Sequence, residues 1–176
     1  MHANHQFKVS SERTKTLSQE AEMWSATTLE DSNPNARWRA MQELSRLGPA
    51  RIAQHADAVV ARLKDCDIYV RITALETLGK LEPATLAQHV DVIVTKLADL
   101  NERVRRAALE LLGKLEPATL AQHADAVVAR LEDSAWDVRK MALETLGKLE
   151  PAAFAAARAM HHEREVEAWR RRMDEL

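Results

Sequence analysis

Three histidines recur at a fixed interval, and an aspartate follows each of them two residues later. They are His55, His89 and His123, followed by Asp57, Asp91 and Asp125. Imidazole and carboxylate groups bind metals, but an interval of 34 residues is typical of stacked helical units. Equivalent helices of such units lie about 8–10 Å apart, whereas zinc needs each imidazole nitrogen within about 2.1 Å. We therefore predict that the histidines pack at unit boundaries and that no metal is bound.

Two further features invite a chemical interpretation. The pair His162-Glu163 follows His161, but a metal site needs ligands from two or more helices and no other unit repeats the pair. Cys66 is the one cysteine, which excludes an intrachain disulfide, and it stands between two aspartates. A reactive thiolate needs a positive environment, so we expect an inert turn residue. No nucleophile or acid–base pair stands out, and we predict a non-enzyme without a cofactor.

The repeat that places these residues is nearly exact. The stretch 79–89 recurs intact at 113–123, and its first half recurs at 147–152. Between 74–97 and 108–131, 18 of 24 positions are identical. Such self-similarity indicates a solenoid of identical supersecondary units.

Each unit is expected to hold two helices. In the unit from Pro83, one apolar stripe has helical spacing: Leu86, Val90, Ile93, Val94 and Leu97. After a polar turn, a second stripe follows: Val104, Ala108, Leu109, Leu112 and Leu115. No alternating apolar run suggests a strand. We predict first helices near 49–63, 83–97 and 117–131, and second helices near 34–47, 68–81, 102–115 and 136–149.

The order Leu-x-Asp, a short turn, Val-Arg, Ala-Leu and Leu-Gly resembles the HEAT-repeat family. It reads Leu97-Ala98-Asp99 and then Val104-Arg105 in the third unit, and the first unit keeps the register in degenerate form. The resemblance implies an all-α fold, a right-handed α-α superhelix of the HEAT/armadillo type, with about four helix pairs and irregular caps. It also implies that first helices line the convex side and second helices the concave side. We divide the chain into a polar segment with a weak capping helix (1–28), the repeat array (29–154) and a long amphipathic helix (155–176).

An aspartate and an arginine occupy fixed places in every unit. They are Asp31, Asp65, Asp99 and Asp133, with Arg37, Arg71, Arg105 and Arg139. The resemblance implies that this ladder bridges neighbouring units, and the planar guanidinium suits it because it binds two acceptors at once. We expect removal of Asp99 to leave Arg105 unpaired.

Charged or polar residues one helical turn apart predict surface pairs on the second helices. The pairs are Glu76–Lys80, Glu110–Lys114, Glu144–Lys148 and Gln42–Arg46. We expect each to solvate the helix surface and to stabilise it by a few tenths of a kcal/mol. Their mixed charge argues against a nucleic-acid partner.

Three positions at the start of the second helices vary while the framework is constant. From them we predict a partner-binding set on the concave face: Trp38, Tyr69, Ile72, Arg103, Arg106 and Lys140. Trp, Tyr and Arg dominate interface hot spots, and contiguous exposed apolar surface marks binding sites. We therefore expect a protein–protein interaction scaffold or adaptor that binds a segment of another protein.

The last helix carries an apolar seam of four residues: Val166, Trp169, Met173 and Leu176. The spacing is like that of a coiled coil. Two alternatives stay open, a homodimer formed through this seam and a helix that folds back to cap the last unit.

Other functions of HEAT-like proteins are alternatives. Tubulin-binding modules use a tryptophan in the turn within a repeat, and Trp136 lies in such a turn. HEAT-like enzymes include bilin lyases and deoxyhypusine hydroxylase, which binds iron through repeated His-Glu pairs. The net charge of −2 disfavours a globally basic nucleic-acid binder, and no apolar run could span a membrane. We expect an intracellular, cytoplasmic protein.

Overall fold

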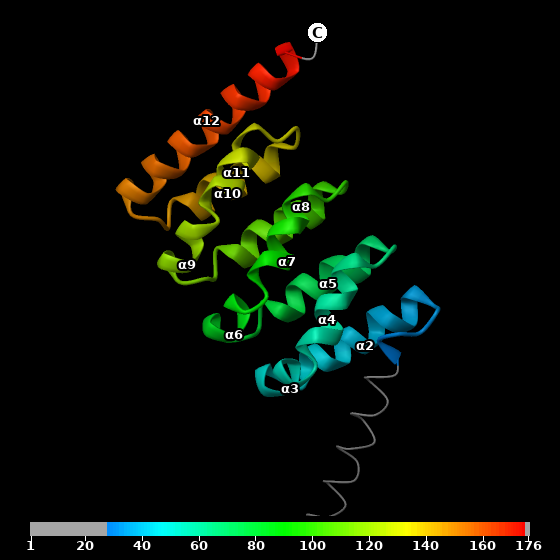
Figure 1. Ribbon diagram of the computed structural model, residues 1–176. Coiled ribbons are helices and arrows are strands. Elements are labelled where there is room, and N and C mark those ends of the chain that lie inside the picture. Colours follow the sequence, from blue (N-terminus) through cyan, green and yellow to red (C-terminus); the bar gives the residue numbers. More distant parts are fainter. Residues whose placement is uncertain (1–27, 175–176) are drawn as a thin grey trace, which may run out of the picture.

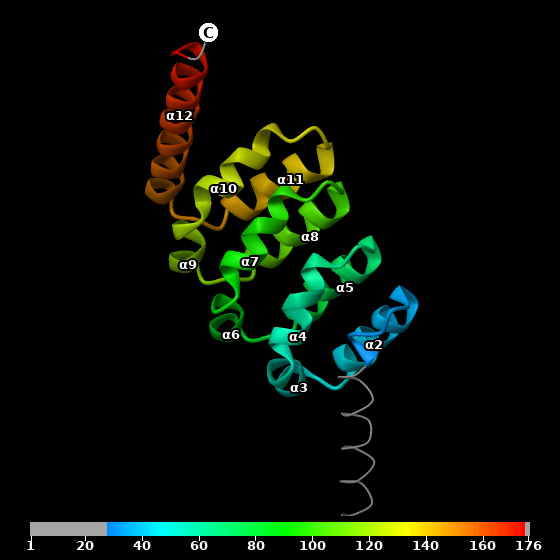
Figure 2. The same cartoon turned by 45° about the vertical axis from the view of Figure 1, so that its right-hand side comes forward.

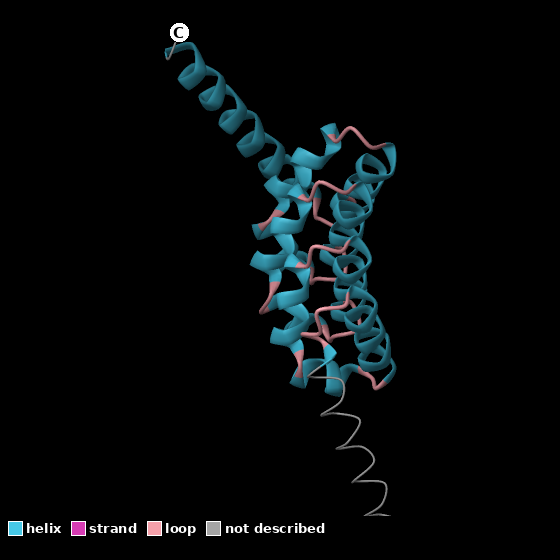
Figure 3. Ribbon diagram, turned by 90° about the vertical axis from the view of Figure 1, so that its right-hand side faces the viewer, coloured by secondary structure: helices cyan, strands magenta, loops and turns pink. Residues whose placement is uncertain are grey.

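The computed structural model of the chain describes residues 28–174, and all regular structure in that range is helical. The helices form two layers that run along a stack (Figures 1 and 3). The prediction of an all-α solenoid of paired helices is therefore confirmed.

One layer consists of the second helices of the four units. These are α2 (Pro34–Arg46), α5 (Ile68–Leu78), α8 (Glu102–Leu112) and α11 (Trp136–Leu146). Successive members pack directly on one another, and each begins after the short turn that carries the conserved aspartate. Asn33, Asp67 and Asn101 cap the first three through their side chains. The fourth begins at Trp136, and Ala135 at its N-cap position provides no side-chain hydrogen bond.

The other layer differs from the prediction of one helix per unit. Each first helix is two short helices and a 3-10 turn: α3 (Pro49–Gln54), α4 (Ala56–Ala61) and η1 (Arg62–Lys64); α6 (Pro83–Ala87), α7 (Val90–Thr95) and η2 (Lys96–Ala98); α9 (Pro117–Gln122), α10 (Ala124–Val128) and η3 (Ala129–Glu132). The break falls at His55, His89 and His123, whose φ near −115° lies outside the helical range. Figure 1 shows α3, α6 and α9 turned aside at the edge of the stack.

The last described element, α12 (Pro151–Asp174), starts at the place of a fifth first helix but continues without a break. Ala157 occupies the position of the three histidines, within a run of alanines that are the strongest helix formers. The helix packs on α10 and α9 and rises away from α11 (Figure 2). Its side chains at 165, 168, 169 and 172–174 are outside the description.

The core is one continuous apolar layer between the two helix layers. Leu86, Ile93, Val104, Leu109 and Leu112 are fully buried in it, as their stripes predict. Second helices contact one another extensively, whereas the three described split first helices contact one another far less. From this difference in packing we infer that the second helices form the inner, concave side of the stack, as the sequence resemblance implies.

Candidate functional site

The aspartates and arginines that recur in each unit form a ladder from one unit to the next. Arg37 donates through Nε and Nη2 to both carboxylate oxygens of Asp65, each at 2.6 Å. Arg105 donates in the same way to Asp133, from Nε at 2.8 Å and from Nη2 at 2.6 Å. In the middle rung Arg71 lies 3.0 Å from Asp99. The expectation that Asp99 pairs with Arg105 is wrong, because Arg105 takes only the backbone carbonyl of Asp99 and its carboxylate partner belongs to the next unit.

The ladder also fixes the turn within each unit. Arg71 Nη1 donates to the carbonyl oxygens of Asp65 and Cys66, six and five residues before it. The Asp65 carboxylate accepts the backbone N–H of Asp67, which in turn caps α5. Each rung therefore joins two units and holds the backbone that starts a concave-face helix.

Two rungs show the electrostatic consequence of this geometry. Burial opposes ionisation of Asp65 and Asp133, yet the hydrogen bonds from Arg37 and Arg105 hold the pKa of each carboxyl below its usual value. The same hydrogen bonds raise the pKa of the two arginines. These ion pairs stay fully charged at neutral pH.

The predicted pairs of Glu with Lys on the second helices are not the contacts that these lysines make. Lys80 donates to the carbonyl of Ser45, Lys114 to that of Gly79, and Lys148 to that of Gly113. The reason is that α5 ends at Leu78, so Lys80 lies beyond the helix turn that Glu76 occupies. Each lysine instead neutralises the carboxyl end of the preceding second helix. In α2, Arg46 binds Glu43 rather than Gln42.

The residues predicted to contact a partner lie on the second helices, mostly at their amino-terminal ends. Tyr69 is 55% exposed and Trp38 39%, Ile72 is half-buried, and the three cations Arg103, Arg106 and Lys140 are exposed. The guanidinium of Arg103 lies 5.8 Å from the centroid of the Tyr69 ring, a cation–π contact across two units. Tyr69, Ile72, Arg103 and Arg106 therefore gather on α5 and α8, with Trp38 one unit below on α2 and Lys140 one unit above on α11.

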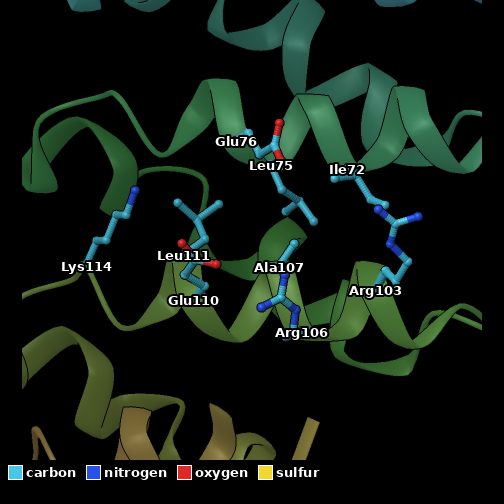
Figure 4. Close-up of a pocket in the computed structure, with 9 residues that line it drawn as sticks. All are labelled: Ile72, Leu75, Glu76, Arg103, Arg106, Ala107, Glu110, Leu111 and Lys114. Atoms are coloured by element: carbon cyan, nitrogen blue, oxygen red, sulfur yellow. The ribbon is translucent and has the colours of Figure 1, made fainter. Parts of the chain in front are cut away.

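A pocket of about 120 Å³ opens between α5 and α8 within this set (Figure 4). Its apolar lining comes from Ile72, Leu75, Ala107 and Leu111. Its charged lining comes from Arg103, Arg106, Lys114, Glu76 and Glu110. Sequence reasoning found Ile72 and the two arginines through their variability. It missed Leu75, Glu76, Glu110 and Lys114 because their positions hold the same residue in the second, third and fourth units. Ala107 and Leu111 stand at variable positions, but they are apolar, and nothing in the sequence separates such a pocket lining from the core.

The candidate metal ligands lie apart. In the part of the chain that the structure describes, no group of three or more His, Cys, Asp or Glu is arranged to hold a metal ion. His161 and His162 instead line a second pocket with Leu143 and Phe154, at the carboxyl end of the array. Cys66 Sγ accepts a hydrogen bond from Arg37 Nη2 at 3.8 Å. The two aspartates that flank Cys66 along the chain gave no indication of this positively charged neighbour.

The first half of α12 packs against the array, with Ala157 buried and Arg164 paired with Asp125. Val166 is half-buried. Leu176 and the side chains of Trp169 and Met173 lie outside the description, so the association seam stays a prediction. Among the helices of residues 28–174, none is long and apolar enough for a membrane crossing.

Comparison with known proteins identifies the architecture. The family model for HEAT repeats matches residues 56–147 and 90–172. A designed armadillo repeat protein in complex with the peptide (KR)4 superposes with a TM-score of 0.64 at 16% identity, over 84% of this chain and 74% of that one. The complex of CpcE and CpcF of phycocyanin lyase from Nostoc sp. PCC7120 gives 0.53 at 21% identity, over 84% and 88%. Among curated proteins, the comparison finds no match for this chain.

Proposed function

The chain belongs to the HEAT-repeat family, and from that premise we propose that it is a non-catalytic scaffold or adaptor that binds a segment of another protein along its concave face. Folds of this type are typical of protein-binding scaffolds. The similar designed armadillo repeat protein is bound to a peptide, which supports peptide binding as a use of this architecture. Function must still be argued from the site, because one solenoid fold serves many tasks.

The observation that carries the proposal is the pocket between α5 and α8. It combines an apolar lining with two exposed arginines on one helix, and Tyr69 lies beside Arg103. Among the described side chains Arg106 forms no ion pair, although Glu76 and Glu110 line the same pocket, so its guanidinium is available to a ligand. Its surroundings therefore resemble an interface hot spot, in which aromatic and arginine side chains flank an apolar pocket.

The chemistry of the pocket favours one class of anchor. A volume of about 120 Å³ accommodates a single side chain rather than a cofactor. An aliphatic stem would lie on Ile72, Leu75 and Leu111, and a carboxylate at its tip would reach Arg103 and Arg106. We therefore expect the partner segment to place a glutamate, or a carboxylate beside an aliphatic residue, at this point.

The experiment selects peptides that bind the wild-type protein from a displayed library of random sequences. The affinity of the enriched peptides is then measured by titration calorimetry. We expect enrichment of acidic residues beside aliphatic or aromatic ones. Arg106→Ala should weaken binding by about tenfold or more, since hot-spot truncation costs on the order of 2 kcal/mol. The control Lys64→Ala removes an exposed cation from η1 in the other layer and should leave affinity unchanged. Equal affinity of Arg106→Ala and wild type would exclude the pocket.

Tubulin recognition is a second candidate because Trp136 is 62% exposed at the start of α11. The ammonium of Lys140, on the same helix, lies 5.4 Å from the centroid of its ring, so this exposed tryptophan has a basic neighbour. Co-sedimentation of the protein with microtubules, compared with Trp136→Ala, tests this alternative. Binding that depends on Trp136 and not on Arg106 would favour tubulin over the concave pocket.

We also propose that the chain has no enzymatic activity. The similarity to phycocyanin lyase, at 21% identity, supports a shared fold alone. An assay of bilin attachment with apo-phycocyanin and free bilin is the direct check, and turnover in it would overturn this part of the proposal.

A further inference from the structure

Two series of contacts between units run along the stack, the Asp–Arg ion pairs and the hydrogen bonds from lysines to backbone carbonyls. In each series, the group at α11 that would pair with a following unit has no such partner among the described residues. Arg139 donates to the carbonyls of Asp133 and Ser134, as its counterparts do in their own turns. Unlike Arg37, Arg71 and Arg105, it faces no carboxylate of a following unit among the described residues. In the lysine series, the carbonyls of Ser45, Gly79 and Gly113 each accept a hydrogen bond from a lysine of the next unit. Gly147 is the next position in the same register.

The apolar side of the same face is uncovered. Leu143 is 61% exposed, whereas the equivalent residues Leu75 and Leu109 are 1% and 0% exposed beneath the next second helix. Beside it lies a pocket of about 400 Å³ between η3, α11 and α12, with Leu131 and Phe154 in its lining. Because α12 already occupies the place of a fifth first helix, the open place is that of a second helix.

The opposite end of the described array presents a second helix that has no described first helix. This is α2, and it carries the complementary member of both series. Asp31, the counterpart of Asp65, is exposed, and its carboxylate accepts only the N–H of Asn33 among the described residues. Arg46, the counterpart of Lys80, is exposed and bonded within its own helix to Glu43.

We propose that the α2 end of a second copy docks on α11 beside α12, so that the two copies complete one helix pair between them. In this arrangement Arg139 binds the second copy's Asp31, and the second copy's Arg46 reaches the Gly147 carbonyl. The contact repeats the interface that already joins α2 to α5 within the chain. It uses different surfaces on the two copies, so it builds open chains rather than a closed dimer. This inference is independent of the proposed binding function.

The chemistry of the α2 face sets the strength of the contact. Beside the exposed Trp38, its outward residues include Arg39, Glu43 and Arg46, which are exposed and charged. Their aliphatic stems can cover Leu143, but the main attraction is between charges. The association should therefore be weak, reversible and weakened by salt.

The test is sedimentation velocity of the full chain across micromolar to millimolar concentrations, at low and high salt. We expect the wild-type mass to rise past a dimer at low salt and to fall back at high salt. Leu143→Glu blocks the α11 end, and Asp31→Arg blocks the α2 end, so each variant alone should stay monomeric. The control Leu100→Glu places the same change at a fully exposed turn position and should associate like wild type.

Mixing the two blocked variants gives the decisive result. The Asp31→Arg protein keeps an intact α11 end, and the Leu143→Glu protein keeps an intact α2 end, so the mixture should form a one-to-one dimer and nothing larger. A wild-type protein that is monomeric at every concentration would overturn the proposal. So would blocked variants that associate like wild type, a result that would point to the seam on α12, or a mixture that stays monomeric.

Discussion

At the scale of single residues, the Asp–Arg ladder holds the units together. Asp65 is nearly inaccessible and receives two hydrogen bonds from Arg37 and one from the N–H of Asp67. Asp65→Ala leaves the Arg37 guanidinium without its carboxylate at a unit boundary, which should cost about 1–3 kcal/mol in the free energy of unfolding. Urea denaturation measures this. Asp31→Ala is the matched control, because that carboxylate has no described arginine partner, and its loss should cost less. Equal effects of the two changes would contradict the ladder.

The same carboxylates predict how stability depends on pH. The pKa values of Asp65 and Asp133 are lowered in the folded chain, so the unfolded chain binds protons more readily. Their contribution is therefore complete above the unfolded value of about 3.9 and is lost as pH falls through the folded pKa. The urea midpoint of the wild type should drop as the pH is lowered below about 4. The double variant Asp65→Asn/Asp133→Asn should have a lower urea midpoint at neutral pH and a smaller fall of that midpoint on acidification. Parallel curves of midpoint against pH for the two proteins would refute the linkage.

At the scale of helices, the units differ at the residue that begins each second helix. Asn101 accepts the N–H of Arg103 at 2.9 Å, whereas Ala135 in the fourth unit accepts nothing through its side chain. Ala135→Asn should therefore stabilise the protein by about 0.5–2 kcal/mol. Asn101→Ala should destabilise it by a similar amount. Thermal unfolding followed by circular dichroism measures both, and a melting temperature that moves with neither would show that these caps do not limit stability.

The helices also show how far the sequence determines the structure. The 34-residue period and the apolar stripes predict the pairs of helices and their burial, because every unit repeats the same core. The breaks at the histidines escape this reasoning, since the apolar positions on both sides of His89 keep helical spacing. The direction of the ladder escapes it too. Asp99 follows Arg71 by 28 residues and precedes Arg105 by six, and both separations recur along the repeat. The sequence therefore does not show which arginine binds the carboxylate, and the packing of the units selects Arg71.

At the scale of the whole molecule, the closely packed second helices give the concave face a continuous row of variable side chains. Tyr69, Ile72, Arg103 and Arg106 lie together where α5 meets α8, and Trp38 and Lys140 are exposed on the neighbouring helices α2 and α11. The sequence predicts this row because the variable positions lie off the apolar stripes. It does not predict the pocket, which the packing of α8 on α5 creates.

The most direct test of the central claim, that a partner segment binds along the concave face, is hydrogen–deuterium exchange with and without a library-selected peptide. Binding along this face should add protection in α5 and α8, extending to the amino-terminal turns of α2 and α11. Exchange in α4, α7 and α10 of the outer layer should be unchanged. Protection confined to the outer layer or to α12, with α5 and α8 unaffected, would contradict it.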